Sequence, residues 1–240
     1  MNDLEKNNLL KKAKNWFKDV VAVNHIKNTK KLVDIKEFNV NPFLATYLSN
    51  FLTGNSNPKS IAKALIYPRV LGTSITTSFG TNIQRFTTEV LDAFGSTTSG
   101  IDIEFKDCLD GQKKYCQLKA GPNTINKDDV ETIANHFKGV INLSRTNSLN
   151  LSFDNMIVGI IYGLEEEISS HYRRITSQYH FPVKVGQDFW TRLTGDHHFY
   201  FELIKSVSEV AIESDYSKEL NNVIEELSHS TLVQNLAYNT

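Results

Sequence analysis

The sequence predicts an α/β fold in which a β-hairpin, a helix and a buried strand follow one another, with further helices towards both ends of the chain. Residues 101–105 alternate apolar and acidic side chains, which is typical of a strand with one buried face. Asp110-Gly111 indicates a hairpin turn, because both central residues of a type I′ turn need a positive φ. Residues 156–162 are continuously apolar, as expected of a strand buried on both faces.

Helical patterns precede the hairpin. Residues 3–22 and 42–53 are typical of amphipathic helices, and residues 60–67 predict a short helix that ends near Pro68. The helix that follows carries Glu89 on the flank of an apolar stripe made by Ile83, Phe86, Val90 and Phe94.

The register of the hairpin follows from its turn. If residues 110–111 are the two-residue loop, the numbers of paired residues sum to 221. Asp102 is then opposite Lys119, and Glu104 is opposite Gln117. Directly opposed residues share a face, with Cβ atoms about 4.5–5.5 Å apart, so all four polar groups are expected to converge on one side of the sheet.

A tight turn and a capped helix are predicted directly after the hairpin. Gly121-Pro122-Asn123 is a turn sequence, Asn126 is suited to the N-cap of a helix, and Asp129 falls at the capping-box position. The residues expected to face the core are Val130, Ile133, Ala134, Phe137 and Val140.

The polar face of the hairpin suggests a chemistry. An acid, an amide oxygen and a lysine can together hold a divalent cation against a phosphodiester and position a water to attack it. Charged residues that alternate along a hairpin are also typical of a half-exposed sheet with cross-strand ion pairs, and the alternation by itself fits both interpretations.

The order of these elements resembles the PD-(D/E)XK nuclease superfamily. More narrowly, residues 100–105 joined to residues 117–126, together with residues 186–196, resemble type II restriction endonucleases that cut interrupted palindromes of the GGNCC kind. The resemblance covers about residues 42–205. It implies a central mixed sheet flanked by helices, with added N- and C-terminal helices.

The predicted organisation has three consecutive parts. Residues 1–58 form an N-terminal helical region, a candidate DNA-binding or dimerisation arm. Residues 59–205 form the catalytic core, and residues 206–240 form a C-terminal helical tail.

The resemblance also assigns roles. Asp102 would bridge a Mg²⁺ ion and the scissile phosphate, with Gln117 and the backbone carbonyl of Leu118 as further ligands. Lys119 would orient the attacking water. Gln117 departs from the superfamily, which has an acid at this position, so Glu104 and Glu89 are candidates for the missing negative charge.

Composition limits the class of protein. Hydrophobic content of 40%, charged content of 22% and a net charge of −1 are those of a globular protein. No apolar run approaches the ~20 residues of a membrane helix, and the start lacks a signal-peptide pattern, so we expect a cytoplasmic protein. Cys108 and Cys116 are expected to be reduced thiols.

Positive charge is concentrated rather than general. Residues 1–40 hold nine lysines against five acids, whereas residues 201–240 hold seven acids against two lysines. A sequence-specific DNA-binding protein needs a local basic surface rather than a high overall charge. The candidate DNA-contacting residues are Lys11, Lys12, Arg145, Arg173, Arg174, Lys184 and Arg192.

The sequence as a whole is interpreted as a Mg²⁺-dependent type II restriction endonuclease. By the resemblance it acts as a homodimer on double-stranded DNA, leaves 5′-phosphate ends and requires a cognate DNA methyltransferase in the host. Two alternatives remain open at this point: a structure-selective repair or recombination nuclease, and a DNA-binding module whose catalytic site has decayed.

Overall fold

The structure is a computed structural model that describes residues 1–214 and 216–238, and the chain divides into two compact units. The sheet unit comprises residues 1–16 and 83–207, and the helical unit comprises residues 17–82 and 208–240. These boundaries do not coincide with the expected ones after residues 58 and 205, because each unit is assembled from segments that are distant in the sequence. No helix among the described residues is long and apolar enough to cross a membrane.

The sheet unit is built on four strands in the order β1-β2-β3-β4. These are β1 (Ile103–Lys106), β2 (Lys113–Lys119), β3 (Met156–Ile160) and β4 (Val183–Val185). β1 and β2 are antiparallel, whereas β2, β3 and β4 are mutually parallel. The predicted α/β fold with a mixed central sheet is therefore confirmed.

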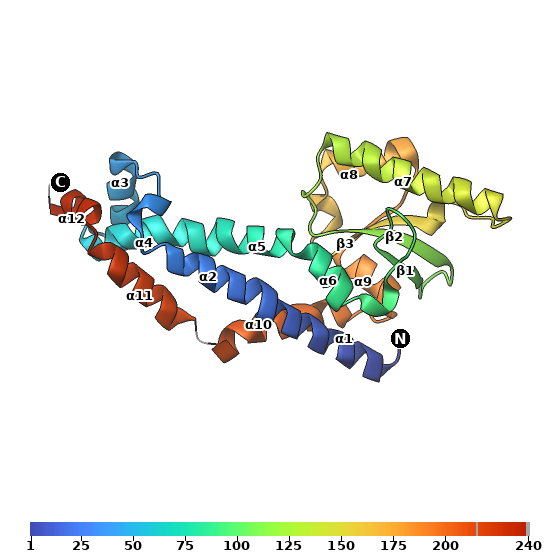
Figure 1. Cartoon of the computed structure of the whole chain (residues 1–240), viewed down its shortest axis with the longest axis horizontal. Helices are drawn as coiled ribbons and strands as arrows, with labels where there is room; N and C mark the ends of the chain where they lie inside the picture. The colour runs from blue at the N-terminus through green and yellow to red at the C-terminus, as the bar shows by residue number, and fades with distance from the viewer. Residues whose placement is uncertain (215, 239–240) are drawn as a thin grey trace. The chain divides into compact units, whose positions relative to one another are not determined.

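Helices cover both faces of this sheet (Figure 1). On one face, α7 (Lys127–Thr146) and α8 (Ser170–Tyr179) pack on the fully buried strand β3. On the other face, α9 (Gly186–Thr194) places Phe189 against Phe105 of β1, with ring centroids 6.4 Å apart. Gly159 of β3 permits this contact, because a Cβ atom there would lie 2.6 Å from the Phe189 ring.

The cap of α7 is the one predicted. The Asn126 side chain accepts hydrogen bonds from the backbone N–H groups of Asp128 and Asp129, and the Asp129 carboxylate accepts one from the N–H of Asn126. The reciprocal capping box fixes where α7 begins, and so fixes which of its residues point at the sheet. All five residues predicted to face the core are buried.

The hairpin register differs from the prediction by two residues. Glu104 is opposite Tyr115, and Lys106 is opposite Lys113, so paired numbers sum to 219. The N–H of Asp107 also donates to the Gln112 carbonyl, which leaves a four-residue loop over 108–111. A type I′ turn cannot form, because only Gly111 of the two turn residues has a positive φ.

A shift of two residues keeps every side chain on its predicted face. Asp102, Gln117 and Lys119 therefore still share one face of the sheet. It is the face covered by α7, because Gln117 is paired with Val158 and Lys119 with Ile160 of β3.

The remaining elements of the sheet unit lie around this core. They are α1 (Asp3–Trp16), α6 (Ile83–Glu89), the short 3₁₀ turns η4 (Asp92–Phe94), η5 (Phe153–Asn155) and η6 (Glu165–Glu167), and the start of α10 (Phe199–Ser214). Phe86 of α6 makes edge contacts with Trp16 at 4.9 Å and with Trp190 at 6.2 Å between ring centroids. Phe189, Trp190 and Leu193 of α9 are buried core residues.

The helical unit has a core of its own. Its elements are the π-helix η1 (Phe17–Ala22), α2 (Val23–Lys31), η2 (Ile35–Glu37), α3 (Pro42–Thr53), α4 (Pro58–Pro68), the π-helix η3 (Arg69–Ser74), α5 (Ile75–Thr81), α11 (Ser217–Ser228) and α12 (Thr231–Tyr238). The buried residues of α11, which include Val223, Ile224 and Leu227, belong to this core, and α11 packs on α4.

The predicted short helix is α4, which ends at Pro68 as expected. The chain continues through η3 into α5. A π-helical turn is wider than an α-helical turn, and such turns are a known way of accommodating a local disturbance in a helix. The helix over 42–53 agrees with its prediction, with Asn41 as N-cap and Gly54 closing it in the left-handed conformation.

Candidate active site

The three predicted catalytic side chains line one cavity of about 260 Å³ in the sheet unit. Asp102, Gln117 and Lys119 come from the β1–β2 hairpin. The opposite wall is provided by α7, and its members include Asp129, Thr132, Ile133 and His136.

Asp102 is anchored by the backbone of the neighbouring strand. Its own N–H donates to the Cys116 carbonyl at 2.9 Å, and its Oδ2 atom accepts a hydrogen bond from the Leu118 N–H at 2.7 Å. Burial raises the pKa of the Asp102 carboxyl above its usual value, against the opposing effects of the Leu118 N–H and the Lys119 charge. A cation beside this carboxylate would offset the cost of burying its charge.

The Gln117 amide is buried and held at its nitrogen. Only 6% of the residue is exposed, and the Nε2 atom donates to the Gly100 carbonyl and to His136 Nδ1, the latter at 2.8 Å. Because the nitrogen occupies both contacts, the Oε1 atom is directed away from them and remains an acceptor for another group.

Lys119 ends β2 at the rim of this cavity. Its backbone carbonyl accepts a hydrogen bond from the Ile161 N–H, which ties the end of β2 to the end of β3. Among the described residues, no carboxylate forms an ion pair with the Lys119 amine. The Lys119 charge is nevertheless close enough to Asp102 to lower the pKa of that carboxyl.

The Leu118 carbonyl faces the same edge of β2 as Asp102. The Leu118 N–H binds the Asp102 carboxylate, and the N–H and C=O of one strand residue point to the same edge. A carboxylate, an amide oxygen and a backbone carbonyl are hard ligands that suit a small divalent cation. Since the described residues contain no group of three acidic, histidine or cysteine side chains that could hold a metal, a cation here would depend on this mixed set.

Residues 14–215 of the chain match the family model described as type II restriction endonuclease EcoO109I. This match spans most of the sequence. The chain belongs to the EcoO109I family of type II restriction endonucleases. No curated protein matches the chain. The chain is therefore a site-specific deoxyribonuclease, and enzymes of its class generally use a divalent metal.

Glu104 does not reach the cavity of this restriction endonuclease. Its Oε1 atom accepts hydrogen bonds from the hydroxyls of Ser96 at 2.5 Å and Thr98 at 2.9 Å, and its Oε2 atom pairs with Lys113 at 2.6 Å. Burial raises the pKa of Glu104, but these three hydrogen bonds together lower it below its usual value. Both oxygens are thus engaged in holding the hairpin.

Glu89, the other candidate for the missing charge, lies on the exposed surface of α6. It pairs with Arg85 at 2.8 Å, one helical turn away, and it is not among the residues that line the cavity. The structure therefore brings together Asp102, Gln117 and Lys119 but neither of the two glutamates.

The candidate DNA-contacting residues are spread over the sheet unit. Five of them have protein partners. Lys12 pairs with Asp92, Arg192 with Asp107 and Asp188, and Lys184 with Asp188, while Arg173 donates to the Glu166 carbonyl. Arg174 donates to the Gln178 side chain on the surface of α8. Lys11 and Arg145 are exposed on α1 and α7.

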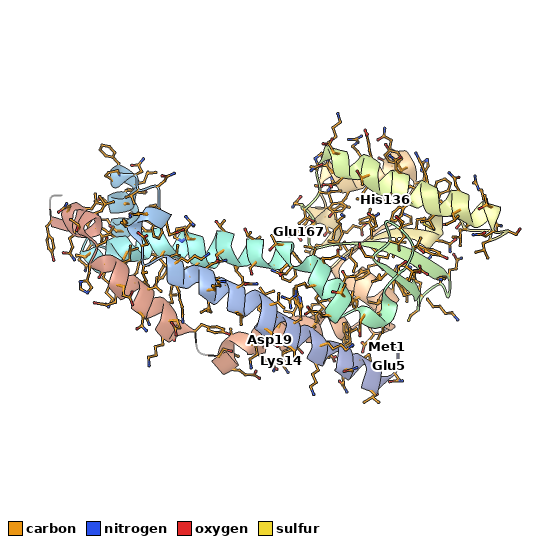
Figure 2. The ribbon with its side chains drawn as sticks, viewed as in Figure 1. Met1, Glu5, Lys14, Asp19, His136 and Glu167 are labelled. Carbon is orange, nitrogen blue, oxygen red and sulfur yellow. The ribbon has the colours of Figure 1, made fainter. Side chains whose placement is uncertain are left out.

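His136 and Asp129 are the cavity residues that the sequence reasoning missed. Figure 2 labels His136, which α7 presents towards the sheet. The signal was available: counted from the Asn126 cap, residues 129, 132, 133 and 136 recur at the spacing of one helical face. A search for apolar periodicity does not find this flank of α7, because most of its residues are polar.

Proposed function

We propose that this enzyme is a Mg²⁺-dependent homodimer that cuts double-stranded DNA at a short interrupted palindrome of the GGNCC kind. The observation that carries the proposal is the convergence of Asp102, Gln117 and Lys119 on the α7 face of the sheet. Oxygen ligands of this kind suit Mg²⁺, which retains several waters and needs only one or two protein carboxylates besides phosphate oxygens.

Asp102, Gln117 and the Leu118 carbonyl would hold the cation. When bound, the cation would supply charge that stabilises the transition state at phosphorus and acidifies a nearby water. Lys119 would hydrogen-bond the attacking water and orient it towards the phosphorus atom. Attack of the water oxygen breaks the bond between phosphorus and the 3′ oxygen, which leaves with a proton from solvent, so the products are a 5′-phosphate and a 3′-hydroxyl.

The homodimer is supported by a large exposed apolar surface in the helical unit. α3 contains no charged residue, and its outward residues include Phe43, which is 86% exposed, and Phe51, which is 78% exposed. The apolar surface comprises Phe43, Leu44, Tyr47, Leu48, Phe51 and Leu52 of α3 together with Leu71. These side chains expose roughly 700–800 Å², close to the ~800 Å² that each partner contributes to a standard interface.

A second copy of the chain is the partner that best fits this surface. A palindrome presents two equivalent half-sites, which a two-fold symmetric dimer can engage together. A membrane-binding helix would carry Lys or Arg beside its apolar face, and α3 carries neither. Phe43→Ser combined with Phe51→Ser is expected to shift the protein from dimer to monomer in analytical ultracentrifugation. Leu4→Ser, at a residue 80% exposed in the sheet unit, is the control that should leave the dimer intact.

The decisive test of function is cleavage of unmethylated phage and plasmid DNA by the purified protein, with Mg²⁺ or with EDTA, beside Lys119→Ala. Discrete fragments that require Mg²⁺ and disappear in the variant are expected, and mapping of their ends gives the site and the 5′-phosphate. DNA that is bound but stays intact with both Mg²⁺ and Mn²⁺ would instead indicate a decayed binding module. Cleavage that depends on junctions or ends would indicate a structure-selective nuclease.

Two expectations about the host accompany the proposal. A sequence-specific nuclease that acts in the cytoplasm meets the chromosome of its own cell. A cognate DNA methyltransferase is therefore expected there, and methylation of the mapped site should block cleavage.

A further inference from the structure

The orientation of the Gln117 amide is determined by two acceptors. A backbone carbonyl can only accept a hydrogen bond, so the Gly100 carbonyl requires the nitrogen, not the oxygen, of the amide beside it. The second N–H is directed to His136 Nδ1 at 2.8 Å, which requires that this ring nitrogen carry no proton. With both N–H groups occupied, rotation of the amide by half a turn would place its oxygen against two acceptors.

Gly100 also makes room for the imidazole. Its φ is +76°, and a Cβ atom at this position would lie 2.5 Å from Cγ and 2.7 Å from Nδ1 of His136. Glycine is thus required both for the backbone conformation and for the close approach of the ring. The segment before β1, the middle of β2 and the middle of α7 consequently meet at a single side-chain amide.

We propose that His136 is a positioning residue that, with the Gly100 carbonyl, presents the Gln117 oxygen to the catalytic cation. The inference rests on the proposed role of Gln117 as a metal ligand. This positioning explains how an amide can act as a metal ligand where the superfamily has an acid. The Gln117 oxygen carries no full negative charge, but its two hydrogen-bonded N–H groups fix its direction before the cation binds. Second-sphere hydrogen bonds of this kind orient ligands and tune their affinity for the metal.

A carboxylate at position 117 would meet a different environment. In Gln117→Glu, an oxygen would replace the nitrogen that donates to the Gly100 carbonyl, and no hydrogen would lie between the two acceptors. The cavity therefore fits an amide better than a carboxylate. Gln117→Glu, which restores the acid typical of the superfamily, is expected to weaken cation binding in the presence of His136.

The test compares matched substitutions at adjacent positions of α7 in the full-length protein. His136→Leu removes the acceptor, His136→Asn keeps an acceptor oxygen on Cγ, where Nδ1 is attached in histidine, and Asn135→Leu introduces leucine at the neighbouring residue, which does not line the cavity. The first readout is the side-chain amide signal of Gln117 in metal-free protein by NMR. Both N–H protons should be protected from exchange with water in the wild type and in Asn135→Leu, and one should lose protection in His136→Leu.

The second readout is the affinity for Mn²⁺ alone, measured by electron paramagnetic resonance. We expect it to fall about 10–100-fold in His136→Leu, to stay within about threefold of the wild type in His136→Asn, and to be unchanged in Asn135→Leu. The Mg²⁺ concentration for half-maximal cleavage should shift in parallel, whereas a purely structural role would lower the amount of active enzyme without moving this midpoint.

The outcomes separate this inference from the function on which it rests. Wild-type protein that binds Mn²⁺ and cleaves DNA, with His136→Leu indistinguishable from Asn135→Leu, would overturn the role of His136 and leave the proposed function intact. Wild-type protein that neither binds Mn²⁺ nor cleaves would overturn both. Higher Mn²⁺ affinity in Gln117→Glu would also overturn the inference, because the cavity would then prefer the acid.

Discussion

The two ends of the β1–β2 hairpin carry similar side chains but use them in opposite ways. At the loop end, Asp107 is fully buried and pairs with Arg192 at 2.8 Å, and the buried Lys114 pairs with Asp110 at 2.6 Å. At the cavity end, the Asp102 carboxylate is held by a backbone N–H instead of a side-chain cation.

This difference separates structural charges from functional ones. A charge that is already paired within the protein attracts a ligand only weakly. Its removal destabilises the fold, because its buried partner is left without a counter-charge. A charge held by the backbone keeps its geometry while its electrostatic potential remains available to a cation or a phosphate. The loop end should therefore determine stability, and the cavity end should determine catalysis.

The largest effect is expected from two lysines of the same strand. Lys119→Met should reduce the cleavage rate at least about a hundredfold, since it removes a positioned donor from the reaction, with little change in the melting temperature. Lys114→Met should do the reverse, because it leaves Asp110 and the Asp154 carbonyl without their cation. Cleavage rates and thermal unfolding of both variants test the contrast, and loss of activity in both with equal loss of stability would refute it.

The buried ion pair provides the next largest effect. Arg192→Met leaves the fully buried Asp107 without its cation and should lower the free energy of unfolding by about 3 kcal/mol. Arg85→Met is the matched control: its pair with Glu89 is exposed, so a change below about 0.5 kcal/mol is expected. Urea unfolding measures both, and comparable losses would show that burial does not distinguish the two pairs.

Two glycines sharpen the comparison further. Gly100 has φ +76° and Gly111 has φ +72°, so alanine should be strained at both positions, by about 1 kcal/mol. At Gly111 nothing lies within 4 Å of the new methyl group, whereas at Gly100 it would collide with His136. Gly111→Ala should therefore retain full activity per folded molecule, and Gly100→Ala should lose most of it. Equal activities would argue against the contact between Gly100 and His136.

The smallest effect concerns the pH dependence of stability. The folded-state pKa of Glu104 lies below its usual value, so its contribution is present above about pH 4.3 and is lost as the pH falls through the folded-state pKa. Glu104→Gln should cost less than about 1 kcal/mol at pH 7 and should flatten the stability profile between about pH 5 and pH 3. A profile as steep as that of the wild type would exclude Glu104 as a contributor.

Local sequence patterns were enough to predict several elements of the sheet unit. The capping box at Asn126, the core-facing residues of α7 and the buried strand β3 follow from rules that need only a few neighbouring residues. The shared face of Asp102, Gln117 and Lys119 also survived, because the actual register differs from the predicted one by an even number of residues. The predicted two-residue turn is wrong, because a type I′ turn needs a positive φ at both central residues and Asp110 does not have one.

The sequence alone determined which functional groups share the cavity. Gln117 and Lys119 alternate along one strand and Asp102 precedes the neighbouring strand, and strand geometry places alternating residues on one face of a sheet. Tertiary structure alone decided what surrounds them. The ion pair of Asp107 with Arg192 joins residues 85 positions apart, and the contact of Gln117 with His136 joins a strand to a helix. Such contacts depend on how the elements pack against one another, which no spacing within a single segment encodes.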